Sequence, residues 1–179
     1  MIYSPSHDSW LLAKAVKKYA KNMKVLDMGS GSGIQAQAAR EAKAKSILAS
    51  DINEEAVSRL KSLNINAIHS NLFSNIKGRF NLVIFNPPYL PKDKREDKES
   101  QLATSGGKKG DEIILKFLNQ ASSHLEKGGI ILIVVSSLTP KPRILKILRS
   151  QNMKHEVLAK KSFFFETLEV WKIEIDLKT

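Results

Sequence analysis

The amino-acid sequence predicts an α/β fold: a mostly parallel sheet of seven strands with an antiparallel hairpin at its C-terminal end. Two observations indicate this fold. Helix-like and strand-like apolar patterns alternate along most of the 179 residues, which is typical of a parallel sheet with helices on both faces. The last two strand-like stretches have no room for a helix between them, so they should pair antiparallel. The length suits a sizeable core, and we expect a single domain over residues 1–179.

Apolar spacing assigns the elements in order. An amphipathic helix comes first, at about 9–20, and strands and helices then alternate. In chain order they are strand 24–28, helix 34–42, strand 47–51, helix 53–63, strands 66–70 and 80–85, helix 111–125, strand 129–136 and helix 141–150. The first helix should bury Trp10, Leu11, Leu12, Ala15, Val16 and Tyr19.

The tail departs from the alternation. Residues 154–161 and 168–176 are strand-like, and a short segment with Phe163, Phe164 and Phe165 joins them. We expect these phenylalanines to lie in the core or to close the hairpin, although an exposed subset would form a partner surface.

A glycine-rich turn follows the strand at 24–28. It contains Gly29, Gly31 and Gly33, and a helix begins directly after it. Glycines at such a turn let the backbone approach a ligand closely. The next strand ends in Asp51, where a carboxylate is placed to hold ribose hydroxyls. The turn is therefore expected to bind a nucleoside-containing cofactor. The alternative is that the three glycines serve only the strand-to-helix geometry.

Two cofactors fit that description, a dinucleotide and S-adenosylmethionine. The glycine spacing here is G-x-G-x-G, whereas the pyrophosphate-binding fingerprint of dinucleotide sites needs G-x-x-G at its end. The carboxylate of Asp27, just before the loop, would also repel a pyrophosphate, while it suits an ammonium or sulfonium ligand. The residues therefore favour S-adenosylmethionine over NAD.

The segment Asn86-Pro87-Pro88-Tyr89 directly follows the apolar run at 80–85. Its two prolines fix φ and remove two N–H donors, so the turn is stiff and rich in unpaired carbonyls. The Asn86 amide and a bare carbonyl beside it can accept both hydrogens of an –NH2 group, while Tyr89 can cover that group with a flat face. Such a turn presents a neutral nitrogen nucleophile to a methyl donor. The alternative is that Asn86 only initiates a turn.

Composition limits the partners. The net charge of +11 makes RNA or the ribosome a candidate neighbour, although a solvated lysine-rich surface explains the same charge. The absence of cysteine excludes disulfides, cysteine-based zinc sites and thiol catalysis, and the four histidines show no ligand spacing, so no metal is expected. The N-terminus is too polar for a signal peptide and no apolar run is long enough to span a membrane, so we expect a cytoplasmic location without a membrane partner.

Six segments in order resemble the HemK family of protein glutamine methyltransferases, which modify class I translation release factors. They are residues 3–9, the glycine turn after Asp27, Asp51, the Asn86–Tyr89 turn, a second glycine segment with Gly106, Gly107 and Gly110, and Glu166-Thr167-Leu168. The first and last resemble signatures of the short eukaryotic–archaeal branch, which lacks the N-terminal helical domain of the bacterial proteins. The resemblance covers essentially the whole chain and implies a Rossmann-like, class I S-adenosylmethionine-dependent fold. For the second glycine segment, an ordinary loop is the alternative.

The resemblance also implies site roles. The glutamine of a Gly-Gly-Gln motif would lie against Asn86 and Tyr89, with its two amide hydrogens on the Asn86 side-chain oxygen and the Pro87 carbonyl. The donor site would comprise Gly29, Gly31 and Gly33 along the methionine and ribose, Asp51 at the ribose and Asn71 at the adenine. Ile52, Leu72 and Asn86 would be further contacts of the donor. Asp27 would face the amino group or structure the loop. Asp8 and Ser9 would close over the donor or, alternatively, cap the first helix.

The same resemblance implies a partner, and the length and position of the loop after Tyr89 predict a substrate lid or docking segment. A small zinc-binding activator protein would dock on the predicted edge strand near Ala67–His69. The long loop at 90–109 would cover the acceptor entrance, unless it has no role. Two other functions remain open: a nucleic-acid amino-methyltransferase acting on adenine N6 or guanine N2, and a non-catalytic RNA- or ribosome-binding protein.

Overall fold

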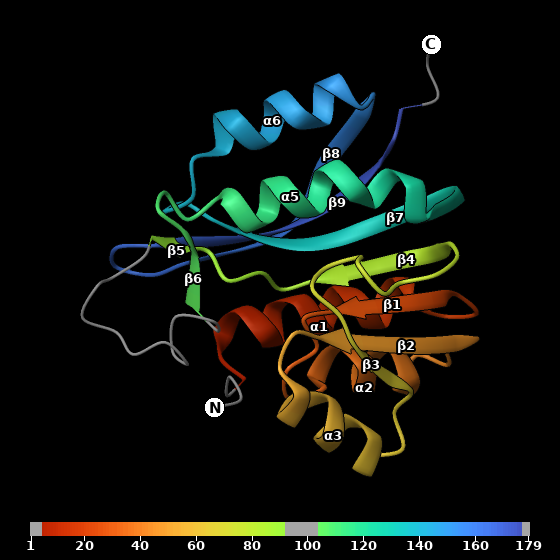
Figure 1. Ribbon diagram of the computed structural model, residues 1–179. Helices are drawn as coiled ribbons and strands as arrows, with labels where there is room; N and C mark the ends of the chain where they lie inside the picture. Colours follow the sequence, from red (N-terminus) through yellow and green to blue (C-terminus); the bar gives the residue numbers. More distant parts are fainter. Residues whose placement is uncertain (1–4, 92–103, 177–179) are drawn as a thin grey trace.

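The computed structural model describes residues 5–91 and 104–176, and a seven-stranded sheet runs through its centre with helices on both sides (Figure 1). The strand order is β3-β2-β1-β4-β7-β9-β8. The strands are β1 (Lys24–Met28), β2 (Ser46–Asp51), β3 (Ala67–His69), β4 (Phe80–Phe85), β7 (Leu125–Ser136), β8 (Met153–Ser162) and β9 (Thr167–Ile175). The pairs from β3 to β7 are parallel, whereas β9 pairs antiparallel with both β7 and β8. The predicted mostly parallel sheet with a C-terminal hairpin is confirmed.

Helices cover the two faces of the sheet. They are α1 (His7–Tyr19), α2 (Ile34–Glu41), α3 (Glu54–Ser62), α5 (Glu112–Ala121), a 3-10 turn (Ser122–His124) and α6 (Lys141–Ser150). On one face α5 and α6 pack on the sheet, and on the other α1 and α2 do so. Helix α3 packs with α2 against β2 and β3.

The central strands alternate their side chains between these two layers. In β1, Leu26 packs under α5 and α6, while Val25 packs under α1 and α2. The same alternation separates Val83 from Leu82 in β4. Because helices cover both faces, these strands are apolar at nearly every position, which is why their sequences look like continuous hydrophobic runs.

The first helix differs from its prediction at one end. Leu12, Ala15 and Val16 are buried as expected, but Trp10 is 58% exposed, while Asp8 and Ser9 are buried. A helix advances about 100° per residue, so Trp10 lies nearly opposite Leu12, whereas Ser9 and Asp8 share the inner face with it. The inward orientation predicted for Trp10 was therefore wrong.

The predicted loop at 90–109 contains two short strands. β5 (Leu90–Pro91) and β6 (Ser105–Gly107) form a separate two-stranded parallel sheet. The intervening residues 92–103, the core of the predicted lid, lie outside the described residues, as do residues 3 and 4 of the N-terminal signature. The ends of the loop are thus paired to one another beside the Asn86–Tyr89 turn.

The two edges of the large sheet are β3 and β8. The edge position predicted for β3 is confirmed, although the strand has only three residues. Among the described residues, no helix is both long enough and apolar enough to cross a membrane.

Candidate active site

A cavity of about 390 Å³, within the size range of small-molecule and cofactor sites, lies at the carboxyl edge of the sheet. The chain passes from β1 through β2 to β3 and then returns past β1 to β4, so the loops after β1 and β4 diverge there. Ligands of open α/β sheets bind at such a switch point. Of the predicted site residues, the cavity is lined by Asp8, Ser9, Gly29, Gly31, Asp51, Ile52, Asn71, Leu72, Asn86, Pro87 and Tyr89.

The glycine loop after β1 is fixed by the end of β2. The Gly31 N–H donates to Asp51 Oδ2 at 2.8 Å, and the Asn53 N–H donates to Asp51 Oδ1 at 2.9 Å. The Ser30 N–H donates to the Ser50 carbonyl at 2.9 Å. Asp51 Oδ2 therefore holds the glycine loop, and Oδ1 holds the turn before α3. Each oxygen keeps further acceptor capacity for the hydroxyls of a ribose.

Asp27 has a structural role. Its side chain is 1% exposed, is not part of the cavity wall, and accepts hydrogen bonds from Ser30 Oγ and, at 3.0 Å, from the Ala36 N–H. Burial raises the pKa of the Asp27 carboxyl to about 7, although these hydrogen bonds oppose the shift. Of the two predicted roles, the geometry supports structuring the loop.

Gly33 also serves the fold rather than the cavity wall. It is the N-cap of α2 with a φ of 86°, a conformation that favours glycine. A Cβ at this position would lie 2.9 Å from Leu60 Cδ2 on α3. The lining role predicted for Gly33 was therefore wrong, because its surroundings are the packed side chains of α3.

The far end of the cavity is flanked by residues after β2 and β3. Ile52 is 45% exposed, and Leu72 has a φ of 49°, which is unusual for a residue with a side chain. The Leu72 carbonyl accepts a hydrogen bond from Ser70 Oγ at 2.7 Å, which holds the turn after β3. Ile52 and Leu72 supply apolar surface for a flat base, and the neighbouring Asn71 side chain supplies polar atoms.

The acceptor turn follows β4 and is joined to α1. Asn86 Nδ2 donates to Asp8 Oδ2 at 3.2 Å. Asn86 Oδ1 is buried and has no hydrogen-bond partner among the described residues. A buried, unpaired amide oxygen costs free energy unless a ligand completes it, so the turn holds an acceptor that lacks its donor.

The second glycine segment lies directly against this turn. A Cβ on Gly106 would overlap the Gly110 carbonyl and lie 2.8 Å from the Pro88 oxygen, and one on Gly110 would lie 2.5 Å from the Tyr89 oxygen. Only glycine allows the two backbones to approach so closely. The segment supports the acceptor turn, so the ordinary-loop alternative is wrong.

The first turn of α1 closes the cavity from the side. The N-cap is Ser6, and Ser9 belongs to its capping box, with the Ser6 N–H donating to Ser9 Oγ at 3.4 Å. Asp8 and Ser9 nevertheless are both buried in the cavity wall. Ser9 therefore combines the two predicted roles, whereas Asp8 faces the acceptor turn.

Gln35 is a site residue that the sequence analysis missed. It is 3% exposed in the cavity wall, and its Nε2 donates to the Ser9 carbonyl at 2.9 Å. Its Oε1 has no partner among the described residues. A signal was present, because Gln35 shares the buried face of α2 with Ala38 and Ala39, where a polar residue is unexpected.

These residues fit S-adenosylmethionine. Gln35 Oε1 offers an acceptor for an ammonium group, Asp51 offers acceptors for ribose hydroxyls, and Ile52 and Leu72 flank a base. Gln35 Oε1 and the Asp51 carboxylate are acceptors, which suits a cationic donor. Among the described residues, no three His, Asp or Glu side chains gather closely enough to hold a metal ion.

Comparison with known proteins identifies the family of the chain. The model of the methyltransferase small domain family matches residues 6–165. A protein of Methanocaldococcus jannaschii, provisionally named protein N5-glutamine methyltransferase, is 37% identical over 183 residues, which cover 96% of this chain and 92% of the relative. Human methyltransferase HEMK2 is 25% identical over 96% of this chain and 88% of its own length.

The fold has a solved counterpart. The structure of the E. cuniculi Mtq2–Trm112 complex, which its authors connect with methylation of the eRF1 translation termination factor, superposes with a TM-score of 0.79. It covers 98% of this chain and 99% of that chain at 23% identity, and therefore supports the fold alone. The class I methyltransferase fold and the use of S-adenosylmethionine predicted from the sequence are confirmed by these comparisons together. The chain belongs to the methyltransferase small domain family and, within it, to the HemK group of protein glutamine methyltransferases.

Proposed function

We propose that this protein transfers a methyl group from S-adenosylmethionine to the side-chain amide nitrogen of the glutamine in the Gly-Gly-Gln motif of a class I release factor. The observation that carries the proposal is the unpaired Asn86 Oδ1 on a proline-stiffened turn in the cavity wall. This oxygen matches one hydrogen of a primary amide. The release factor as substrate is supported by the activity named for Mtq2–Trm112, and the glutamine by the name of the Methanocaldococcus jannaschii relative.

The chain's own residues orient a weak nucleophile. An amide nitrogen attacks poorly because its lone pair is delocalised. Asn86 Oδ1 and the Pro87 carbonyl accept its two hydrogens, which aims the nitrogen and stabilises positive charge as a bond to carbon forms. The Asp8 carboxylate, 3.2 Å from Asn86 Nδ2, polarises the Asn86 amide and strengthens Oδ1 as an acceptor. Tyr89 covers the amide and excludes water. The bound donor supplies a methyl group activated by its sulfonium and would leave as S-adenosylhomocysteine. The methylated nitrogen gives up one of its two hydrogens as a proton.

Labelled methyl transfer tests the proposal. The acceptors are a recombinant class I release factor with the Gly-Gly-Gln glutamine intact, the same factor with that glutamine changed to alanine, and total tRNA, rRNA and DNA. We expect label only in the intact factor, and its loss with Asn86→Ala. Label in nucleic acid and none in the factor would instead establish the amino-methyltransferase alternative, which the net charge of +11 favours.

A small activator protein is the proposed partner, and the edge strand β3 is its proposed docking edge. Within residues 5–91 and 104–176, β3 pairs only with β2, so its outer edge is available for another strand. Leu63, at the end of α3 just before it, is 47% exposed. The solved Mtq2–Trm112 complex supports an activator of this kind. Co-expression with such an activator should raise solubility and methyl transfer, and metal analysis of the purified complex would reveal its zinc. Unchanged solubility and activity would contradict the partnership.

A further inference from the structure

Three consecutive phenylalanines, Phe163, Phe164 and Phe165, form the turn between β8 and β9, here called the aromatic tip. Phe164 is 92% exposed and Phe165 is 85% exposed. Their rings contact one another edge to face, with centroids 4.6 Å apart. Of the positions expected for these residues, the core is wrong, because all three side chains are exposed, whereas the hairpin-closing position is confirmed, since they lie between Ser162 of β8 and Thr167 of β9. Single exposed apolar side chains are ordinary, but adjacent phenyl rings in water indicate a surface that meets a partner.

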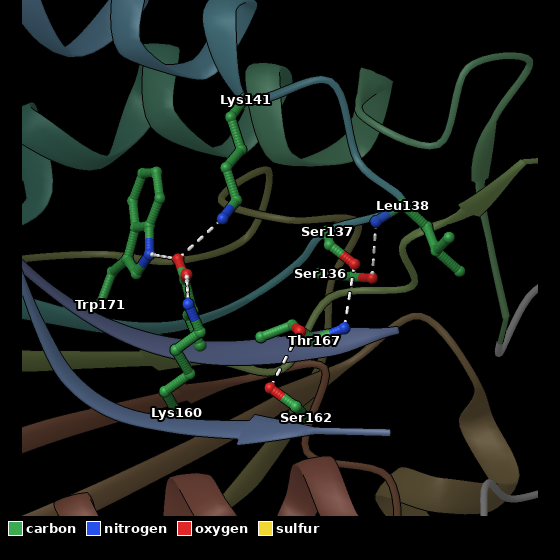
Figure 2. A network of polar contacts seen from close by, with 9 residues as sticks. Ser136, Ser137, Leu138, Lys141, Lys160, Ser162, Thr167 and Trp171 are labelled. Atoms are coloured by element: carbon green, nitrogen blue, oxygen red, sulfur yellow. Dashed lines mark hydrogen bonds and ion pairs between the residues drawn. The ribbon is translucent and has the colours of Figure 1, made fainter. Parts of the chain in front are cut away.

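The turn that carries these rings is firmly anchored. The Phe163 N–H donates to the Glu166 carbonyl at 2.7 Å, and the Glu166 carboxylate accepts from Ser136 Oγ at 2.6 Å. Figure 2 shows the next contacts, in which the Thr167 N–H donates to Ser137 Oγ at 2.9 Å and Thr167 Oγ1 donates to Ser162 Oγ at 3.1 Å. Because hydrogen bonds hold both sides of the turn in place, the fold itself keeps the phenylalanine rings exposed to solvent.

The aromatic tip lies at the same sheet edge as the acceptor turn. In the sheet register, Ser136 at the end of β7 pairs with Leu168, just after the tip. The same end of β7 neighbours the end of β4, from which Asn86 emerges. Phe163 contacts the ring of His7 at 5.2 Å, and the next residue, Asp8, accepts the hydrogen bond from Asn86. A short chain of contacts therefore connects the tip to the acceptor turn.

The surroundings of the tip are cationic and aromatic. Lys161 Nζ lies 5.3 Å from the centre of the Phe163 ring and 2.9 Å from His7 Nδ1. The Lys160 side chain is 61% exposed. Trp10, three positions after His7 on α1 and therefore on a neighbouring part of its surface, is 58% exposed. This composition suits a protein surface with an apolar pocket and acidic margins.

We propose that the aromatic tip docks the protein that carries the acceptor glutamine, with Phe164 and Phe165 as the anchoring side chains. The inference rests on the proposed function and takes the class I release factor as the occupant. A glutamine side chain is a small ligand, so most of the binding free energy of a whole protein substrate must arise outside the cavity. The tip stands at the edge where that protein approaches, and among the described residues the rings of Phe164 and Phe165 belong neither to the cavity wall nor to a core cluster.

The test compares the double variant Phe164→Ser/Phe165→Ser with Val157→Ser, which removes a 46% exposed side chain from the middle of β8. Binding of the release factor is measured by biolayer interferometry with S-adenosylhomocysteine present, and methyl transfer is measured with the whole factor and with a short Gly-Gly-Gln peptide. The double variant should raise the Kd and the KM for the whole factor by about tenfold, leaving kcat and peptide methylation close to wild type. Val157→Ser should change none of these, and Phe164→Leu/Phe165→Leu should restore much of the binding.

Several outcomes would overturn the inference. One is wild-type affinity in the double variant, and another is an equal loss in Val157→Ser. A dimer of the wild type that dissociates in the double variant would make the tip an interface between copies of this chain instead. A wild type that binds the factor through the tip but does not methylate it would refute the proposed function alone. A wild type that does not bind the factor at all would refute the docking inference.

Discussion

The donor loop and the acceptor turn line the same cavity, but different parts of the chain hold them in place. The donor loop is fixed by Asp27 and Asp51, whose hydrogen bonds to the loop and to α2 span 3, 9 and 20 positions in the sequence. The acceptor turn is joined to Asp8, 78 positions away, and packs against Gly106 and Gly110 from beyond the 92–103 segment. The donor loop is thus held from within the β1–α2–β2 unit, whereas the acceptor turn also depends on α1, 78 positions away.

Because the two halves have different supports, variants of the donor loop and variants of the acceptor turn should have different kinetic effects. Changes at the donor loop should alter affinity for S-adenosylmethionine, because the loop and its supports are one local unit. Changes at the acceptor turn and its distant supports should alter the aim of the acceptor nitrogen, because the turn is oriented by α1 and β6 without contributing to the donor loop.

The largest expected effect belongs to Asn86→Ala. Loss of the acceptor oxygen should lower kcat by about a hundredfold or more, because one positioned polar group is typically worth that much. Donor affinity, measured by calorimetry with S-adenosylhomocysteine, should stay within about twofold of wild type, since the variant leaves the donor loop intact. Asn119→Ala, exposed on α5, is the matched control. If donor affinity fell as much as kcat, Asn86 would support the donor loop as well as the acceptor turn, and the proposed separation of the two would be wrong.

Gly106→Ala should act on the acceptor turn from a distance. Its Cβ would press on the Gly110 carbonyl and on the Pro88 oxygen, so the turn must shift. A shift of this kind should lower kcat by about tenfold to a hundredfold. Gly128→Ala adds a methyl group where nothing lies within 4 Å, at a φ of 75°, and should reduce only stability. Thermal unfolding of both variants separates the two effects, and full activity in Gly106→Ala would show that the glycine contact does not position the turn.

Asp51→Asn tests the donor half. An amide oxygen can replace only one of the two carboxylate oxygens that hold the Gly31 and Asn53 N–H groups. The Kd for S-adenosylhomocysteine should rise about tenfold, or about 1.4 kcal/mol, while kcat at saturating donor stays near wild type. If the variant bound S-adenosylhomocysteine normally but had a low kcat, Asp51 would act in methyl transfer and not in donor binding.

The prediction with the smallest expected effect on activity is a pH dependence of stability from Asp27. Its folded-state pKa of about 7 lies above the unfolded value of 3.8, so the folded protein binds more protons between these pH values. The contribution to stability is therefore full below the unfolded pKa and is lost as pH rises through about 7. Asp27→Asn should remove this loss and gain roughly 2 to 3 kcal/mol relative to wild type between pH 5 and pH 8. Urea unfolding at both pH values measures it, and a relative gain toward low pH would contradict the assignment.

The sequence alone determined the order of the elements, the glycine loop with Asp51, and the Asn86–Tyr89 turn. These features could be predicted because their chemistry depends on residues that are neighbours in the chain, and because buried parallel strands leave a recognisable apolar run. A polar motif that directly follows such a run must lie at the carboxyl edge of the sheet. The location of both halves of the site follows from that alone.

Only the tertiary structure decided how these pieces are used. In the folded chain Asp27 and Gly33 lie outside the cavity wall, whereas Gln35 lies in it. Trp10 and the aromatic tip are exposed to solvent. The tertiary structure also joined Asp8 to Asn86 and packed Gly106 under Pro88. Such contacts depend on how α1 and the hairpin pack against the sheet. Local periodicity records which face of an element is apolar, but it does not record which distant backbone that face will meet.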